Sequence, residues 1–152
     1  MPSIETKNFG SVSYEPESVV EFPQGLPGFE ERRGFIALRF PDSEPLIFLQ
    51  SVEDPALCFP TLPVLVVDPK YQLRVSQEDR ELTGLAVGRP LVIGQDVLCL
   101  TVVSLRENGS SANLLAPLVV NLHNRKAVQA VAADSGYSHQ HVLVPDEAAV
   151  CS

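Results

Sequence analysis

The sequence predicts an all-β fold: a single compact, barrel-like antiparallel sheet domain with one short helix. About eight to ten short apolar or β-branched segments follow one another along the chain. Thirteen prolines and nine glycines separate these segments, which favours turns over long helices. Several segments are apolar on both faces, as is typical of strands in a closed sheet. We expect one domain over residues 1–143, followed by a frayed C-terminal tail at 144–152.

The N-terminal part of the chain is predicted to form short strands joined by tight turns. Ile4–Phe9, Val12–Tyr14 and Val19–Phe22 are strand-like pieces. Residues 23–28 contain two prolines and two glycines, which exclude a helix or a central strand and predict a fixed loop. Gly34–Phe40 alternates between large apolar residues and small or polar ones, so we expect a strand with one buried face.

The middle of the chain is predicted to contain two buried strands and the single helix. Leu46–Leu49 and Leu62–Val67 are continuous apolar runs, which indicates strands that are buried on both faces. Ser76 begins a pattern that resembles a capping box, in which a side-chain hydroxyl accepts a hydrogen bond from a backbone N–H in the first turn of a helix. The helix that follows is expected to end at Gly84 or Gly88.

Three strands are predicted in the last third of the chain: Val97–Leu105, the apolar run Ala112–Asn121, and Ala127–Ala133. The central run is the most informative because Pro117 interrupts it. Proline has no N–H group for a sheet ladder, so this strand must lie at an edge, a bulge or a register break. Asn113 and Asn121 lie where the run ends, and we expect their side chains to satisfy loose backbone groups there.

The chain is acidic, and its charge is unevenly distributed. The formal net charge is −8; residues 1–57 carry ten acids and four bases, whereas residues 58–152 carry nine acids and seven bases. Nucleic-acid affinity comes mostly from Lys and Arg, so this balance excludes nucleic acid as a direct partner. It favours a basic protein partner, unless the acidity serves only to keep the chain soluble.

The sequence indicates a cytoplasmic protein without a membrane segment. No apolar stretch is long enough to span a bilayer, and the N-terminus shows no apolar signal region. Cys58, Cys99 and Cys151 are odd in number and widely spaced, which predicts neither a disulfide framework nor a zinc site.

Two acidic segments contain the candidate partner-binding residues. Glu53 and Asp54 lie in a loop where Pro55 disfavours helical backbone at the preceding residue. Glu30 and Glu31 are followed directly by two arginines, which can neutralise them within the same turn. At both places a purely structural or solvated turn is the alternative to partner contact. Catalysis by the paired carboxylates is not favoured, because adjacent side chains diverge and no His or Lys is near in sequence.

No motif of an enzyme or of a cofactor site is present. The sequence lacks GxSxG, HExxH and CxxC patterns and the glycine patterns of nucleotide-binding loops. His139 and His141 would share a face of an extended segment and could supply two metal ligands. A third ligand is not in view, so we expect surface or packing roles for both. We therefore predict no enzymatic activity, no metal and no cofactor.

Several segments, taken together and in order, resemble the signatures of the FliW family of flagellar assembly factors. The resemblance is clearest in the central run Ala112–Asn121 and extends over about residues 4–143. Glu53 stands where the family motif has an aspartate. The other matching segments are Thr6–Gly10, Phe22–Glu30, Leu49–Pro55, Val67–Pro69 and Tyr137–Ser138.

The resemblance implies a function as well as a compact β-barrel-like fold. Members of this family bind CsrA, an RNA-binding translational regulator, and relieve its repression of flagellin translation. They also bind flagellin, so accumulating flagellin takes up the assembly factor and frees CsrA. The resemblance suggests an allosteric mode of action on CsrA that does not compete with RNA. The alternative is a cytoplasmic flagellin chaperone without a regulator-binding role.

Overall fold

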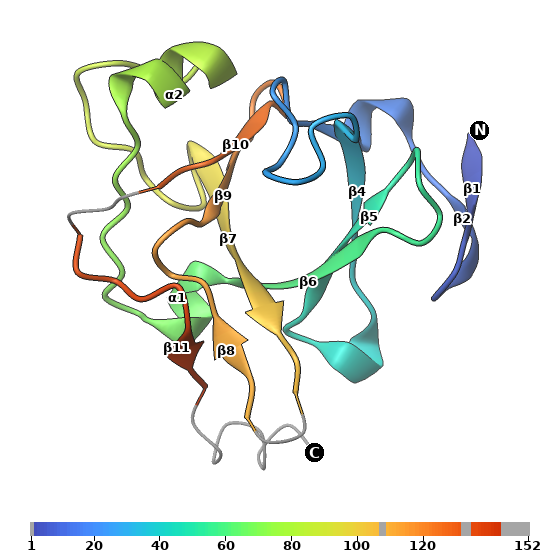
Figure 1. Ribbon diagram of the computed structural model, residues 1–152. Helices are drawn as coiled ribbons and strands as arrows, with labels where there is room; N and C mark the ends of the chain where they lie inside the picture. The colour runs from blue at the N-terminus through green and yellow to red at the C-terminus, as the bar shows by residue number, and fades with distance from the viewer. Residues whose placement is uncertain (1, 107–108, 132–134, 144–152) are drawn as a thin grey trace.

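The computed structural model describes residues 2–106, 109–131 and 135–143. Within these residues the chain forms one large antiparallel sheet, a separate two-stranded hairpin and two short α-helices (Figure 1), which confirms the predicted all-β class. The strands are β1 (Ser3–Thr6), β2 (Gly10–Ser13), β3 (Val20–Glu21), β4 (Gly34–Leu38), β5 (Ile47–Ser51), β6 (Cys58–Pro63), β7 (Val97–Ser104), β8 (Ser111–Ala112), β9 (Leu118–Asn121), β10 (Ala127–Gln129) and β11 (His141–Val142). The helical segments are η1 (Pro16–Ser18), η2 (Pro41–Ser43), α1 (Val64–Val67) and α2 (Gln77–Thr83).

The large sheet is strongly curved (Figure 1) but is not closed by strand pairing. Its order is β10-β9-β7-β6-β5-β4-β3, with β8 paired to the end of β7 and β11 paired to β8. The two edges approach at one point, where β3 meets the turn just before β10: the Glu21 N–H donates to the Arg125 carbonyl at 2.9 Å, and an isolated bridge joins Glu21 to Lys126. One bridge is not a ladder, so the barrel-like closure that the sequence suggested is not confirmed.

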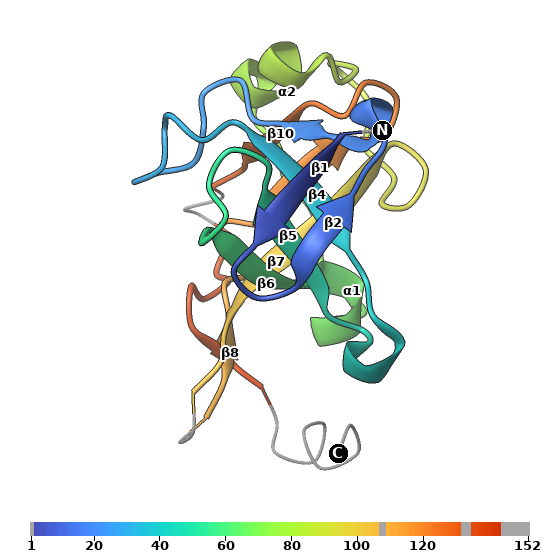
Figure 2. The ribbon, with the colours of Figure 1, turned by 90° about the vertical axis from the view of Figure 1, so that its right-hand side faces the viewer.

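The hairpin of β1 and β2 lies outside the large sheet, in front of β4 and β5 in Figure 2. The ring of Phe9, next to the turn of the hairpin, contacts Phe40 and Phe48 with centroid distances of 4.9 and 5.1 Å. The Lys7 N–H also donates to the Pro55 carbonyl at 2.9 Å. The hairpin is therefore fixed to the body of the protein beside the loop that follows β5.

The core consists of two apolar clusters on opposite faces of the central strands. Leu118 and Val120 of β9 pack into the first cluster and Val119 packs into the second, as the alternation of side chains along a strand requires. Each fully buried large side chain stabilises the fold by about 1.5–3 kcal/mol. The first cluster contains Val20, Phe22, Leu26, Phe35, Ile47, Leu49, Leu100, Leu118, Val120 and Ala127. The second contains Val64, Tyr71, Val75, Leu85, Val97, Cys99, Leu114, Val119 and Ala130.

The central run is broken at its proline, which is one of the three predicted outcomes. β8 ends at Ala112 and β9 begins at Leu118, so Pro117 occupies the break between them. β9 is an interior strand between β10 and β7, and this position leaves no room for proline inside its ladder. Both asparagines satisfy backbone groups as expected: Asn113 Oδ1 accepts from the Ala116 N–H at 3.1 Å, and Asn121 Oδ1 accepts from the His123 N–H at 2.9 Å.

The predicted helix is present as α2. Ser76 Oγ accepts a hydrogen bond from the Asp79 N–H at 3.1 Å, as in a capping box. The helix ends at Gly84, which has φ 74° and donates to the carbonyls of the last turn. Glycine adopts this left-handed conformation without a steric penalty, so the first of the two predicted stop positions is used.

The prediction of a strand over Leu62–Val67 is wrong in its second half. β6 ends at Pro63, and residues 64–67 form the single turn α1, closed by the Asp68 N–H donating to the Val64 carbonyl at 2.9 Å. Leu65 and Val66 are 40% and 49% exposed, so the run is not buried on both faces. The β-branched residues favoured a strand locally, but Pro63 ends the sheet and the chain turns there.

The C-terminal predictions are tested only in part. β10 ends at Gln129, earlier than the predicted Ala133, and residues 132–134 and the predicted tail 144–152 lie outside the described residues. Among the helices of the described chain, none combines the length and apolar character that a bilayer crossing requires.

Candidate functional site

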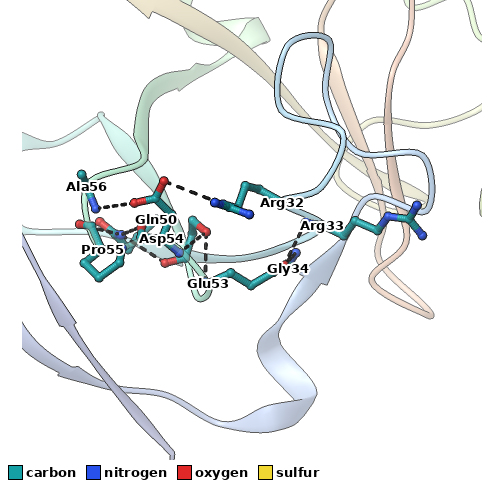
Figure 3. A network of polar contacts seen from close by, with 9 residues as sticks. Arg32, Arg33, Gly34, Gln50, Glu53, Asp54, Pro55 and Ala56 are labelled. Carbon is teal, nitrogen blue, oxygen red and sulfur yellow. Dashed lines mark hydrogen bonds and ion pairs between the residues drawn. The ribbon is translucent and has the colours of Figure 1, made fainter.

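The acidic loop, residues 51–55, is a fixed turn at the end of β5 (Figure 3). Ser51 Oγ accepts hydrogen bonds from the Glu53 and Asp54 N–H groups at 3.0 and 2.9 Å. Asp54 Oδ1 accepts from the Ala56 N–H at 3.0 Å, which completes a second side-chain turn around Pro55. The structural role of Asp54, left open by the sequence, is therefore present, and it does not exclude partner contact.

Gln50 supports this loop from inside the protein and was not singled out from the sequence. Its side chain is fully buried, and Nε2 donates to the carbonyls of Ser51, Asp54 and Pro55 at 3.1–3.3 Å (Figure 3). Gln50 Oε1 has no hydrogen-bond partner among the described residues. One feature of the sequence could have pointed to Gln50: it is a glutamine that ends an apolar run and directly precedes polar turn residues.

Glu53 joins the acidic loop to the turn that precedes β4. Its Oε1 atom accepts from the N–H groups of Arg33 at 2.9 Å and Gly34 at 3.0 Å (Figure 3). These hydrogen bonds, first from Gly34 and then from Arg33, hold the pKa of the Glu53 carboxyl below its usual value of 4.5, and the positive charges of Arg32 and Arg33 act in the same direction. Glu53 is therefore ionised near neutral pH while its side chain remains exposed.

The second predicted acidic segment lies next to the first. Arg32 Nε is 3.8 Å from Asp54 Oδ2, and both side chains are more than a third exposed, so this ion pair is weak. Glu30 Oε2 accepts from the Gly28 N–H at 2.6 Å, within its own turn, and Glu31 is exposed.

The fold therefore brings all four predicted carboxylates to neighbouring segments, together with two arginines. Glu30 and Glu31 precede Arg32 and Arg33 in the turn to which Glu53 is bound. The sequence suggested that Arg32 neutralises the acidic residues of its own turn. In the structure Arg32 instead forms an ion pair with Asp54, in the neighbouring segment. Four carboxylates against two guanidinium groups leave this surface negative, which suits a positively charged partner.

Gly25 shapes the loop that leads into this turn. Its φ is +69°, and a Cβ atom at this position would lie 2.5 Å from the Glu30 backbone. A larger residue would collide with the main chain of the turn and would also be strained in its own backbone. The close approach of residues 25 and 30 holds Glu30 and its neighbours in place.

The histidines and cysteines of the described residues are not grouped into a metal site. No group of three or more His, Cys, Asp or Glu side chains within the described chain is arranged to hold a metal ion. His139 is exposed, and His141 lies in β11 opposite Ala112. Burial raises the pKa of Cys58 to about 11 and that of Cys99 to about 12, so neither thiol is a reactive thiolate at neutral pH.

Comparison with known proteins places the chain in one family. The family model "FliW protein" matches residues 3–143. The flagellar assembly factor FliW of a Geobacillus species is 32% identical and covers 96% of this chain and 98% of its own length, and that of Bacillus subtilis is also 32% identical, over 92% and 95%. A crystal structure of the flagellar assembly factor FliW matches with a TM-score of 0.82 and 31% identity, over 96% of this chain and 99% of the other. The chain therefore belongs to the FliW family of flagellar assembly factors.

Proposed function

We propose that this protein acts in the cytoplasm as a partner switch between CsrA and flagellin. It binds CsrA, which relieves the repression of flagellin translation, and it releases CsrA when flagellin accumulates. Membership of a family of flagellar assembly factors supports the flagellar part of this function. The net charge of −8 supports a basic partner such as an RNA-binding protein, because affinity for phosphate comes from Lys and Arg.

The observation that carries the proposal is the preorganised acidic loop. Glu53 and Asp54 present their carboxylates from a turn whose backbone is held by Ser51 and Gln50. A turn that is already ordered loses little conformational entropy when a partner binds. Exposed carboxylates at the rim of an interface mainly accelerate association with a positively charged surface. The loop therefore suits rapid, salt-sensitive capture of CsrA.

Titration calorimetry and association kinetics with purified CsrA, at low and high salt, test this function. The diagnostic variant is the double substitution Glu53→Gln plus Asp54→Asn, which removes both charges but keeps the acceptor oxygens of the turn. The matched control, Glu78→Gln plus Glu81→Gln, removes two exposed charges from α2, away from the acidic loop in Figure 1. We expect the loop variant to associate with CsrA more slowly and with a weaker salt dependence, and the control to behave like the wild type.

Each alternative gives a different result in these measurements. A wild-type protein that shows no heat and no co-elution with CsrA at low salt contradicts the proposed switch. Binding of flagellin without binding of CsrA identifies a flagellin chaperone that lacks a regulator-binding role. Normal association of the loop variant with CsrA would remove the acidic loop from the interface while leaving the function itself in place.

A further inference from the structure

A cleft of about 270 Å³ lies between the 26–29 segment and the outer part of β7 and β8. Its apolar side is formed by Leu26, Phe29, Phe59, Val102 and Leu118, together with Pro27. Hydroxyl and amide side chains form the remainder: Ser104, Ser111, Asn113, Gln129 and Gln140, with His139 beside them. The cleft thus has an apolar floor and a polar rim that contains no Asp, Glu, Lys or Arg side chain.

The strand register explains this composition. Ser104 pairs with Ser111 across β7 and β8, and the Asn113 N–H donates to the Val102 carbonyl at 3.0 Å. Residues two apart on a strand share a face, so Val102 and Ser104 point to the same side as their partners on the neighbouring chain segment. Phe29 closes the opposite wall, where its ring meets Phe59 edge to face at 5.5 Å.

We propose that this cleft binds an uncharged peptide segment of a partner protein, which inserts a large apolar side chain beside Phe29, between its ring and the hydroxyl and amide side chains of the rim. The inference deepens the proposed function and rests on it, because flagellin is the partner we use as the probe. In this mode the peptide backbone exchanges hydrogen bonds with the hydroxyl and amide rim, whose groups both donate and accept.

The lack of Asp, Glu, Lys and Arg side chains in the cleft favours an uncharged peptide as its occupant. The chain has a net charge of −8, but no Asp, Glu, Lys or Arg is among the cleft-lining residues. A charged group moved into this cleft would lose water without gaining an opposite charge, which is unfavourable. A neutral apolar segment loses nothing of this kind and gains the burial of its side chain.

Size and exposure point to a side chain as the occupant. Small-molecule sites usually enclose about 300–1,000 Å³, and a cleft of about 270 Å³ at the lower end of this range has room for one large apolar side chain. Phe29 is 41% exposed, an unusual position for a large aromatic ring in a chain whose Phe22 and Phe35 are fully buried. Aromatic residues at the wall of a pocket are frequent binding hot spots.

Titration of purified flagellin into three variants, at low and high salt, tests the inference. Phe29→Ala removes one wall of the cleft, and Ser104→Lys places a charge in it at an exposed position that tolerates substitution. The control Val66→Ala shortens an apolar side chain of similar exposure, 49%, that does not line the cleft. We expect both cleft variants to bind flagellin at least tenfold more weakly at either salt concentration, and the control to bind like the wild type. Binding of CsrA should be unchanged in all three variants, and thermal melting verifies that each is folded.

The outcomes separate this inference from the function on which it rests. If the wild type binds flagellin and both cleft variants bind equally well, the cleft inference fails and the proposed function stands. If the wild type does not bind flagellin, the partner switch and the cleft inference fail together. A concentration-dependent dimer that Ser104→Lys abolishes would assign the cleft to a second copy of the chain and overturn the inference. Removal of residues 144–152 should leave flagellin affinity unchanged; a tenfold increase would assign the cleft to the chain's own C-terminus.

Discussion

Glu53 and Arg33 are twenty positions apart in the sequence, yet Glu53 Oε1 accepts a hydrogen bond from the Arg33 N–H at 2.9 Å. The same oxygen accepts from the next N–H, that of Gly34, at 3.0 Å. One carboxylate therefore connects the loop after β5 with the turn before β4. The residue that is the strongest candidate for partner contact is also a structural acceptor, and the two roles have to be measured separately.

Replacing Glu53 with alanine should destabilise the protein. Glu53→Ala leaves two N–H groups without their acceptor, and because the site is exposed we expect a loss of about 0.5–1.5 kcal/mol in the free energy of unfolding. Glu53→Gln keeps an acceptor oxygen at the same place and should therefore lose less stability than Glu53→Ala. Urea denaturation of the three proteins measures the difference. Equal stability of the alanine variant and the wild type would show that the two hydrogen bonds contribute nothing.

The contribution of Glu53 to stability should depend on pH. Its pKa is lower in the folded than in the unfolded chain, so this contribution is fully present above the ordinary value of 4.5 and is lost as the pH falls through the folded-state pKa. The difference in unfolding free energy between wild type and Glu53→Gln should therefore be constant near neutral pH and shrink below about 4.5. Denaturation at a series of pH values checks this expectation, and a difference that grows in acid would contradict it.

Substitution of Gln50 should change the order of the acidic loop more than the stability of the protein. Gln50→Met removes the donor to the Ser51, Asp54 and Pro55 carbonyls but also removes the unpartnered Oε1 atom. The two effects oppose each other, so we expect a change of less than about 1 kcal/mol. Hydrogen exchange of the loop amides should become faster, whereas Gln140→Met, an exposed control, should not affect them. Unchanged exchange in Gln50→Met would mean that Ser51 alone holds the turn.

Two neighbouring asparagines should differ in their importance for stability. Asn121 Nδ2 and Asn124 Nδ2 both donate to the Thr83 carbonyl, at 2.9 and 3.0 Å, which joins the end of β9 to the end of α2. Asn121 is buried and also accepts from the His123 N–H, so Asn121→Ala should cost about 1–3 kcal/mol. Asn124 is exposed, and we expect less than about 1 kcal/mol for Asn124→Ala. Thermal melting of both variants tests this order.

Several elements of the fold could be predicted from interactions between residues that are close in the sequence. Ser76 and Gly84 determine where α2 begins and ends through a hydroxyl cap and a left-handed residue, and both signals act within a few residues. The break at Pro117 follows from a missing N–H group. These features depend on neighbouring atoms of the same segment, and a single sequence contains that information.

The remaining features depend on contacts between distant segments. The four residues of α1 are locally good strand formers, and only the end of the sheet at Pro63 directs them into a turn. The two hydrogen bonds of Glu53 and the ion pair between Arg32 and Asp54 exist because β4 and β5 are adjacent. The sequence identified Glu53 and Asp54 as candidates, but not the groups in the other segment that each of them would meet. The cleft beside Phe29 also depends on the register of β7 and β8.

The segment from Leu26 to Gly34, the first residue of β4, contributes to both surfaces discussed above. Phe29, near one end, forms a wall of the cleft, and the N–H groups of Arg33 and Gly34, at the other end, donate hydrogen bonds to Glu53. A ligand that displaces this segment at Phe29 must weaken the hydrogen bonds from Arg33 and Gly34 to Glu53. A ligand that draws Glu53 away must in turn shift the segment that forms the wall of the cleft. Because free energy is a state function, each ligand would change the affinity of the other by the same factor. One partner would then replace the other without any domain movement, because the two ligands would favour different positions of this one short segment.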